Sequence, residues 1–172
     1  LRRLGYVDVV AVANHNNGAQ KAKELFVEHG YDDYREMIDK ESLDAVHICT
    51  PNNTHYKMAM YAMEHGVNVM LEKPFTMTIE EAEKLCSYAK EHQIVTGVNH
   101  SLRMNPQVQQ MKAMVQSGKV GDIYAVTGCY LQDWLYLDSD WSWRLEPELS
   151  GKTRAFSDIG THWIDMVENI TG

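Results

Sequence analysis

Short apolar runs separated by longer amphipathic stretches fill the first hundred residues of the chain. The apolar runs cover Val7–Ala13, Ala45–Cys49, Val67–Leu71 and Ile94–Val98. Continuous apolar runs, as opposed to an apolar–polar alternation, are typical of parallel strands that are buried on both faces. The stretches between them repeat apolar residues at helical spacing. This alternation of strand and helix predicts an α/β fold with a doubly wound parallel sheet of the Rossmann type.

Several of the predicted helices have recognisable ends. The first begins near Ala19, buries Ala22, Leu25 and Phe26 on one face, and stops at Gly30, a residue type favoured after a helix. Three further starts have capping residues at the favoured spacing: Asp33 with Glu36, Thr78 with Glu81, and Asn105 before Pro106.

The pattern changes after Val98. From Ile123 to Leu131, apolar and polar positions alternate, which predicts an antiparallel strand with one solvated face. We therefore place a domain boundary near residue 120, with a nucleotide-binding domain over 1–120. Residues 121–172 would begin an α+β domain with a mostly antiparallel sheet. Trp134 and Trp141 are expected to pack between the two domains.

Both predicted domains look incomplete. A dinucleotide-binding sheet has its first strand in the middle, followed by a glycine-rich turn, and the sequence contains neither feature. Leu1–Gly5 resembles the tail of the helix that follows such a turn. At the other end, Ile159–Ile170 predicts one amphipathic helix, which is too little to complete a second layer. We therefore expect the sequence to be the middle of a longer protein.

Composition narrows the compartment and the partners. The net charge of −8 argues against nucleic acid or an anionic membrane surface as a partner. No apolar run approaches the roughly 18 residues of a membrane-spanning helix. The three cysteines, Cys49, Cys86 and Cys129, are odd in number and widely spaced. This usage favours a reducing compartment, the cytoplasm, with each thiol as a small core residue.

Polar residues follow three of the predicted strands, where ligands bind in open α/β sheets. Val67–Leu71 runs directly into Glu72-Lys73-Pro74, and the proline restricts the backbone of Lys73. Read alone, this is equally a strand that ends beside a surface ion pair. The other candidates at strand ends are Thr50, Pro51, Asn52 and His55 after the second apolar run and Asn99 after the fourth.

The last predicted helix carries a polar stripe. Asp158 and His162 are four residues apart and therefore share a face, which continues through Asp165 and Asn169. Without further information, this stripe reads as the solvent side of an amphipathic helix. The pair could also bind a metal, but no further ligands accompany it in the sequence, so we predict none.

Four motifs in this order carry a resemblance to a known family. They are Cys49–His55, Glu72–Pro74, Trp143-Arg144 and Asp158–Asp165. The chain resembles the Gfo/Idh/MocA family of NAD(P)-dependent oxidoreductases over essentially its whole length. The resemblance implies hydride transfer between a nicotinamide cofactor and a secondary alcohol or ketone of a sugar, polyol or derivative.

The resemblance also implies roles for individual residues. Removing a hydride from a carbinol requires that the hydroxyl proton leave as well, so the site needs a positioned proton acceptor. Lys73, Asp158 and His162 are implied as the catalytic residues, with the histidine as the usual general acid/base. Asp158 and His162 would contact the substrate. Asn99, which directly follows a predicted strand, is expected to contact the substrate or the cofactor. The implied cofactor contacts are Asn14, Thr50, Pro51, Asn52, His55, Glu72, Lys73, Trp143 and Arg144.

Some of these residues have simpler interpretations. Glu72 either orients Lys73 or is a plain charge at a strand end. His55 is better explained as a residue at a helix start than as a catalyst, and Arg103 as part of a structural ion pair. A lysine near a positively charged nicotinamide and away from water would have its charged form disfavoured.

The cofactor and the quaternary structure are less closely defined. Asn14 stands where an acidic residue would hold the ribose of NAD, or an arginine would accommodate the phosphate of NADP. Both cofactors fit, and the absence of an arginine favours NAD. By resemblance, we expect a homodimer or homotetramer formed through the second-domain sheet. Two other functions stay open: a non-catalytic nucleotide sensor on the same fold, and a structural piece that binds nothing by itself.

Overall fold

The computed structural model describes residues 1 and 3–172. The strands are β1 (Ala11–Ala13), β2 (His29–Tyr31), β3 (Ala45–Ile48), β4 (Asn68–Glu72) and β5 (Thr96–Asn99). The helices are α1 (Gly18–Leu25), α2 (Tyr34–Lys40), α3 (His55–Glu64), α4 (Ile79–Glu91), α5 (Pro106–Gln116), α6 (Pro147–Ser150) and α7 (Thr161–Thr171). Within the described residues, no helix is both long and apolar enough to cross a membrane.

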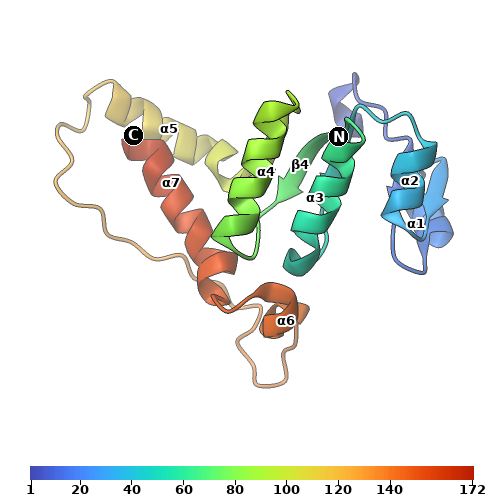
Figure 1. Cartoon of the computed structure of the whole chain (residues 1–172). Coiled ribbons are helices and arrows are strands. Elements are labelled where there is room, and N and C mark those ends of the chain that lie inside the picture. Colours follow the sequence, from blue (N-terminus) through green and yellow to red (C-terminus); the bar gives the residue numbers. More distant parts are fainter.

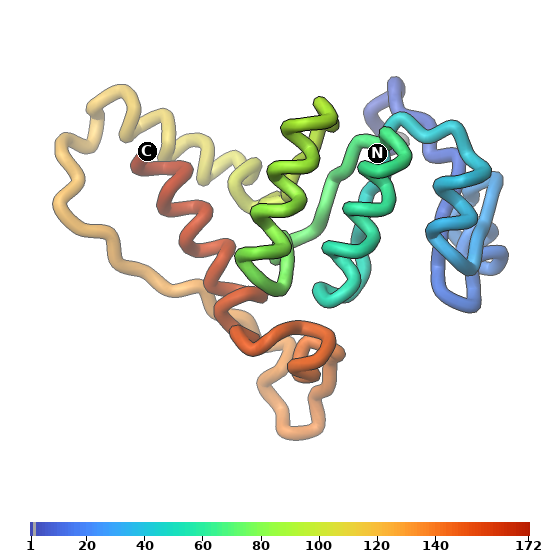
Figure 2. The backbone as a smooth tube through the Cα atoms, in the orientation of Figure 1, coloured from blue at the N-terminus to red at the C-terminus, as the bar shows by residue number. Residues whose placement is uncertain are grey.

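The strands form two separate parallel sheets. β1 pairs with β2, and β3, β4 and β5 form a second sheet in that order. Figures 1 and 2 show the first sheet with α1 and α2 at one side of the molecule, apart from α3 and α4, which lie over β4. The parallel strands joined through helices confirm the predicted α/β class. The single continuous sheet that the sequence predicts is not formed, because neither β1 nor β2 pairs with β3.

The main core lies between one face of the three-stranded sheet and the helices α3 and α4. On β3, Val46 and Ile48 are buried while Ala45 and His47 are exposed, and Val69 and Leu71 of β4 are buried beside them. Leu71 is 1% exposed. The helices contribute Ala59, Ala62, Met63, Leu85 and Ala89. Because a strand turns successive side chains to opposite faces, the other face of this sheet lies open, and Met70 on it is 42% exposed.

The predicted helix starts are confirmed at their capping residues. The side chains of Asp33, Thr78 and Asn105 each accept a hydrogen bond from a backbone N–H of the first helical turn. The reciprocal half of the box is missing at Thr78, because the Glu81 carboxylate accepts from the N–H of Met77.

The predicted end of the first helix is wrong. α1 ends at Leu25, and Phe26 takes the left-handed conformation at φ 54°. Leu25 and Phe26 are exposed, by 44% and 85%. Gly30 lies in β2, where a Cβ atom would come within 2.3 Å of the Gly18 carbonyl oxygen. The sequence hides β2 because three residues without an apolar run give no strand signal.

The predicted antiparallel strand over 123–131 is not formed. No strand occurs between α5 and α6 in the described chain, and Figure 1 shows this segment as an open loop. Tyr124 and Leu131 are 93% and 81% exposed. Alternation predicts a strand only where a partner strand and a layer are present to cover it.

Two further expectations about burial are wrong. Trp134 and Trp141 are 40% and 70% exposed, so neither packs between domains. All three cysteines are exposed, although each was expected in a core. Both errors come from inferring burial from residue type, which fails where no second layer covers the position.

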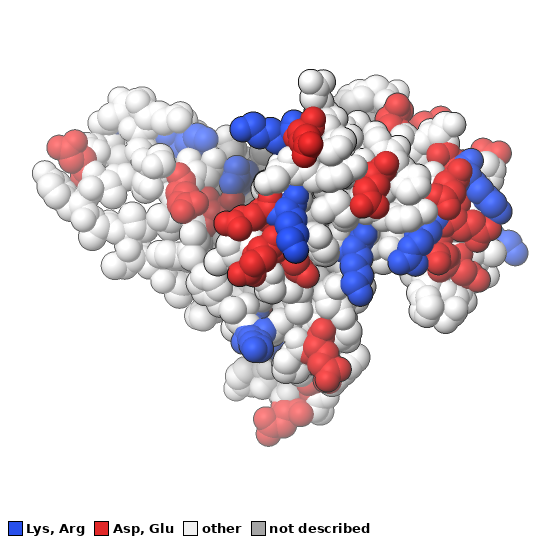
Figure 3. Space-filling view, viewed as in Figure 1, with Lys and Arg blue, Asp and Glu red and all other residues white. Residues whose placement is uncertain are grey.

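Charged side chains are distributed unevenly on the face shown in Figure 3. Lys and Arg alternate with Asp and Glu over the helices, whereas residues 123–132 of the loop between α5 and α6 carry no charged side chain. α5 packs against α7. The predicted domain boundary near residue 120 therefore falls in the loop that follows α5, and it stays a prediction.

Candidate active site

Lys73 directly follows β4, and its amine reaches across to the other half of the chain. Nζ donates hydrogen bonds of 2.8 Å to both the backbone oxygen and Oδ1 of Asp158. The two side chains are only 13% and 11% exposed. The peptide bond to Pro74 is cis. The end of β4 is thereby tied to a residue 85 positions further along the chain.

Asp158 lies in a π-helical turn, Phe156–Gly160, that leads into α7. Such single turns are frequent at functional sites, because they change the direction of side chains along a helix. Arg144 donates from Nε to Oδ1 of Asp158 at 3.2 Å, and its guanidinium carbon lies 4.5 Å from the centre of the Trp143 ring. Asp158 therefore receives two cations on one oxygen, while its buried Oδ2 has no partner.

A cleft of about 170 Å³ opens beside this group. Its lining comes from the turn after β3, the end of β4, the 3-10 turn Trp143–Leu145, and the segment from α6 into the π-helical turn. The lining residues are Cys49, Thr50, Asn52, Glu72, Lys73, Trp143, Arg144, Ser150, Arg154, Ser157 and Asp158. Seven of the predicted site residues therefore lie around one cleft.

His162 belongs to the same region but makes different contacts. Its ring packs edge-on against His100 and Tyr130, each 6.0 Å away between centroids. Burial, followed by the positive charges of Lys73 and His100, lowers the pKa of His162 below its usual 6.5. The buried Nδ1 has no hydrogen-bond partner. The ring is thus held neutral around pH 7, with one nitrogen available.

The polar stripe of α7 faces inward, so its interpretation as a solvent-exposed face is wrong. Asp165 is 8% exposed and accepts hydrogen bonds from Nε and Nη2 of Arg103, the first at 3.1 Å. Asn169 accepts from Lys112 of α5 at 2.9 Å. The predicted structural ion pair of Arg103 is confirmed. The stripe is buried because it meets α5 and the turn after β5, both of which supply cations or imidazole to pair with it.

Glu72 does not orient Lys73, so that interpretation is wrong. Its Oε1 accepts a 2.6 Å hydrogen bond from Nδ2 of Asn99 and lies 3.7 Å from Nε2 of His47. Glu72 and Lys73 are successive residues at a strand end, so their side chains leave on opposite sides. Asn99 holds the Glu72 carboxylate, and its predicted contact with the substrate stays a prediction.

The turn after β3 is fixed by its own side chains. His55 is fully buried, with Nδ1 at 2.8 Å from the Pro74 oxygen and Nε2 at 2.9 Å from the Thr50 oxygen. Asn52 donates to the Ser150 oxygen at 2.9 Å. Thr50 and Asn52 line the cleft, whereas Pro51 is absent from its lining. His55 therefore joins the turn after β3 to the residue that follows Lys73, a supporting position.

Asn14 lies apart from this group. It follows β1, donates its backbone N–H to the Tyr31 oxygen at 2.9 Å, and has an exposed side chain. It belongs to the two-stranded sheet, so the structure does not bring it to the cleft around Lys73. Its role in cofactor choice stays a prediction.

Several residues of the site were not predicted from the sequence. His100 lies against His162, and Ser150, Arg154 and Ser157 line the cleft. Only His100 had a usable signal, since it follows Asn99 at the end of a predicted strand. The other three lie in a segment whose path depends on the contact between Asn52 and Ser150, which sequence periodicity cannot reveal.

Parallel strands joined through helices, with polar side chains gathered at the strand ends, are the architecture of a nucleotide-binding α/β protein. Residues 2–100 match the model of the oxidoreductase family with an NAD-binding Rossmann fold, and residues 108–172 match that of the GFO/IDH/MocA C-terminal domain. The chain belongs to the Gfo/Idh/MocA family.

Individual relatives agree with this assignment. Levoglucosan dehydrogenase of Pseudarthrobacter phenanthrenivorans is 35% identical over 95% of this chain and 42% of its own length. D-glucoside 3-dehydrogenase of Escherichia coli K12 is 30% identical over 96% of this chain and 47% of its own length. A structure of levoglucosan dehydrogenase in complex with NADH and levoglucosan superposes with a TM-score of 0.87 at 34% identity, covering 95% of this chain and 44% of that one.

The chain thus spans less than half the length of the relatives that it matches. The two family models match residues 2–100 and 108–172. Together these ranges include all four motifs identified in the sequence.

Proposed function

We propose that the protein is an oxidoreductase that transfers a hydride between a nicotinamide cofactor and a secondary alcohol or ketone of a sugar, polyol or derivative. The observation that carries this proposal is the contact of Lys73 with Asp158 beside His162. Lys73 and Asp158, which are far apart in the sequence, both line one cleft, and the charge of Lys73 acts on His162 nearby. Family membership and relatives named as sugar dehydrogenases support the same activity.

The residues at the cleft fit a nicotinamide cofactor. Trp143 supplies a flat apolar wall and Arg144 a fixed cation stacked on it, which suit an aromatic ring and phosphates. The Glu72 carboxylate, held by Asn99, suits a ribose hydroxyl. When bound, the cofactor supplies the hydride acceptor or donor.

His162 is suited to handle the proton. Oxidation of an alcohol requires a base that is neutral at working pH, and the lowered pKa of His162 keeps its ring neutral there. Its partner-free Nδ1 can accept the hydroxyl proton. Lys73 has one N–H beyond the two that it donates to Asp158, and this N–H is available to a substrate oxygen.

Polyhydroxylated substrates match the open polar atoms. Asp158 Oδ2 and His162 Nδ1 are buried without partners, and each leaves one acceptor position for a hydroxyl group. An apolar ligand would leave both unsatisfied. The names of the relatives, levoglucosan dehydrogenase and D-glucoside 3-dehydrogenase, fall in the same substrate class.

NAD or NADP serves as cofactor, with NAD favoured. Asn14 can bond to a ribose hydroxyl, and the arginine that would suit a 2′-phosphate is absent after β1. The similar structures include complexes with NADH. We further propose a cytoplasmic homodimer or homotetramer that has neither nucleic-acid nor membrane partners, consistent with the net charge of −8.

An assay of the full-length protein tests the proposal. We expect NAD or NADP to be reduced, followed by absorbance, with at least one member of a panel of sugars, anhydrosugars and inositols. Nucleotide binding without turnover across the panel would instead favour the nucleotide sensor.

A further inference from the structure

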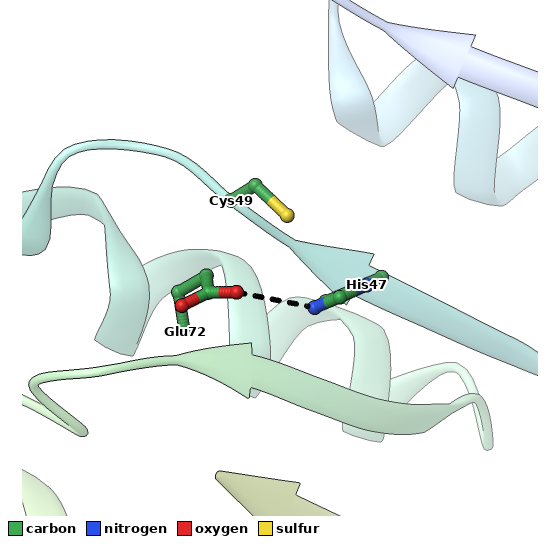
Figure 4. A group of neighbouring side chains, drawn as sticks. All are labelled: His47, Cys49 and Glu72. Carbon is green, nitrogen blue, oxygen red and sulfur yellow. Dashed lines mark ion pairs between the residues drawn. The ribbon is translucent and has the colours of Figure 1, made fainter. Parts of the chain in front are cut away.

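A second group of side chains lies on the open face of the three-stranded sheet. His47 and Cys49 are two residues apart along β3 and its continuation, so they project from the same face. The parallel register pairs Ile48 with Leu71, which places Glu72 beside Cys49 on the neighbouring strand. Figure 4 shows the three side chains turned toward one another.

The donor atoms of this group are close enough to share one ion. Nε2 of His47 lies 3.7 Å from Oε1 of Glu72, and one donor atom from each of the three residues lies within 4.8 Å of the others. Bond lengths of about 2.0–2.3 Å to a tetrahedral ion imply donor separations of about 3.3–3.8 Å. Small side-chain rotations would complete this geometry.

We propose that His47, Cys49 and Glu72 form a binding site for a zinc-class divalent cation. A thiolate, an imidazole and a carboxylate together select zinc or cobalt, since magnesium and calcium prefer oxygen donors alone. Within this chain, the His47 side chain is 32% exposed. The site also has a supporting contact, since Asn99 holds the Glu72 carboxylate at 2.6 Å.

Three protein ligands leave the fourth position of a tetrahedral ion open to water or a ligand. Cys49 and Glu72 also line the cleft next to Lys73, so the ion and a ligand of the cleft share one wall. The consequence for activity rests on the proposed function: we expect zinc to inhibit turnover and a chelator to restore it.

Direct cobalt binding tests the site independently of activity. The full-length protein with Cys86→Ser and Cys129→Ser retains one cysteine of the three in this chain, which removes the other exposed thiols as competing ligands. Titration with Co²⁺ should give one equivalent bound, with a sulfur-to-cobalt charge-transfer band and intense tetrahedral visible bands. Zn²⁺ should displace the cobalt.

Further substitutions separate this site from adventitious binding. Cys49→Ser should abolish the charge-transfer band, and His47→Asn and Asn99→Ala should each weaken binding by about tenfold or more. His65→Asn, an exposed histidine that lies beside Asp39 on another surface, should leave binding unchanged. A cobalt spectrum unaffected by Cys49→Ser in well-folded protein overturns the proposal, whether or not the enzyme assay succeeds.

Discussion

Asp158 and Asp165 lie seven residues apart at the start and middle of the same helical segment, and each is 8% exposed. Both pair with a cation from an earlier part of the chain. Arg103 contacts both oxygens of Asp165. In contrast, Lys73 and Arg144 converge on a single oxygen of Asp158, and Oδ2 is left without a partner.

We interpret this difference as one between a structural ion pair, Arg103–Asp165, and the proposed functional pair, Lys73–Asp158. A buried carboxylate with both oxygens bonded is satisfied by the protein itself, so it serves to position α7. A buried carboxylate with one open oxygen retains a position that a substrate hydroxyl can fill. The comparison predicts that equal burial will have unequal consequences for activity.

Replacing each aspartate by asparagine gives the largest contrast. Asp158→Asn should reduce kcat/KM of the full-length enzyme by about a hundredfold, because the charge beside Lys73 and the substrate is lost. Asp165→Asn should leave kcat/KM of the folded protein within about threefold. Steady-state kinetics on protein shown to be folded by circular dichroism provide the measurement.

Chemical denaturation of the same two variants is the matched control. Each loses a hydrogen-bonded charge pair, so the free energy of unfolding should fall by about 1–3 kcal/mol in both. Equal losses of activity in the two variants would remove the distinction between Asp158 and Asp165.

A smaller effect is expected at the cation that holds Asp165. Arg103→Lys keeps the charge but loses the two-pronged contact, and the Arg103 side chain is 42% exposed. We expect the free energy of unfolding to fall by about 1 kcal/mol with unchanged kcat. A large loss of kcat in this variant would place Arg103 in the chemistry and not in the support of α7.

The smallest predicted effect concerns the pKa of His162. The charge of Lys73 lowers this pKa, whereas the charge of Asp158 raises it. Lys73→Met should therefore raise the pKa of His162, and Asp158→Asn should lower it further. NMR titration of the imidazole proton measures both shifts, with exposed His65 as the reference. Shifts of the same sign in the two variants would contradict the proposed arrangement.

The pH dependence of alcohol oxidation follows from the lowered pKa of His162. The neutral ring of His162 is the competent base. Because its pKa is lowered from 6.5, the ring is mostly neutral at pH 6.5 and above. The acid limb of the kcat profile should therefore lie below pH 6.5, and Lys73→Met should move any residual limb upward. A limb at or above pH 6.5 in the wild-type enzyme would assign the base to another group.

Much of the fold could be predicted because its strands are continuous apolar runs. The runs at Ala45–Cys49 and Val67–Leu71 became β3 and β4 within one residue at each end. Local capping chemistry at Asp33, Thr78 and Asn105 was similarly visible. β2 could not be predicted, since its position depends on the close approach of Gly30 to Gly18 and not on hydrophobicity.

Only part of the candidate site could be predicted from the sequence, because some of its residues are placed by contacts between distant parts of the chain. Lys73 follows a strand, so its location at the ligand-binding edge could be inferred from position alone. The inward orientation of Asp158 and Asp165 could not, because polar residues on an amphipathic helix normally face water. Their burial depends on cations 85 and 62 residues away, Lys73 and Arg103, and periodicity carries no information on such pairs.

Lys73 is proposed to take part in the reaction and not merely in binding. Lys73→Ala in the full-length protein should reduce kcat by about a hundredfold or more while the dissociation constant of the cofactor changes by less than about threefold. Lys112→Ala, which removes the comparable contact of an amine with Asn169 on α7, should retain wild-type kcat. An unchanged kcat in folded Lys73→Ala protein would contradict the account.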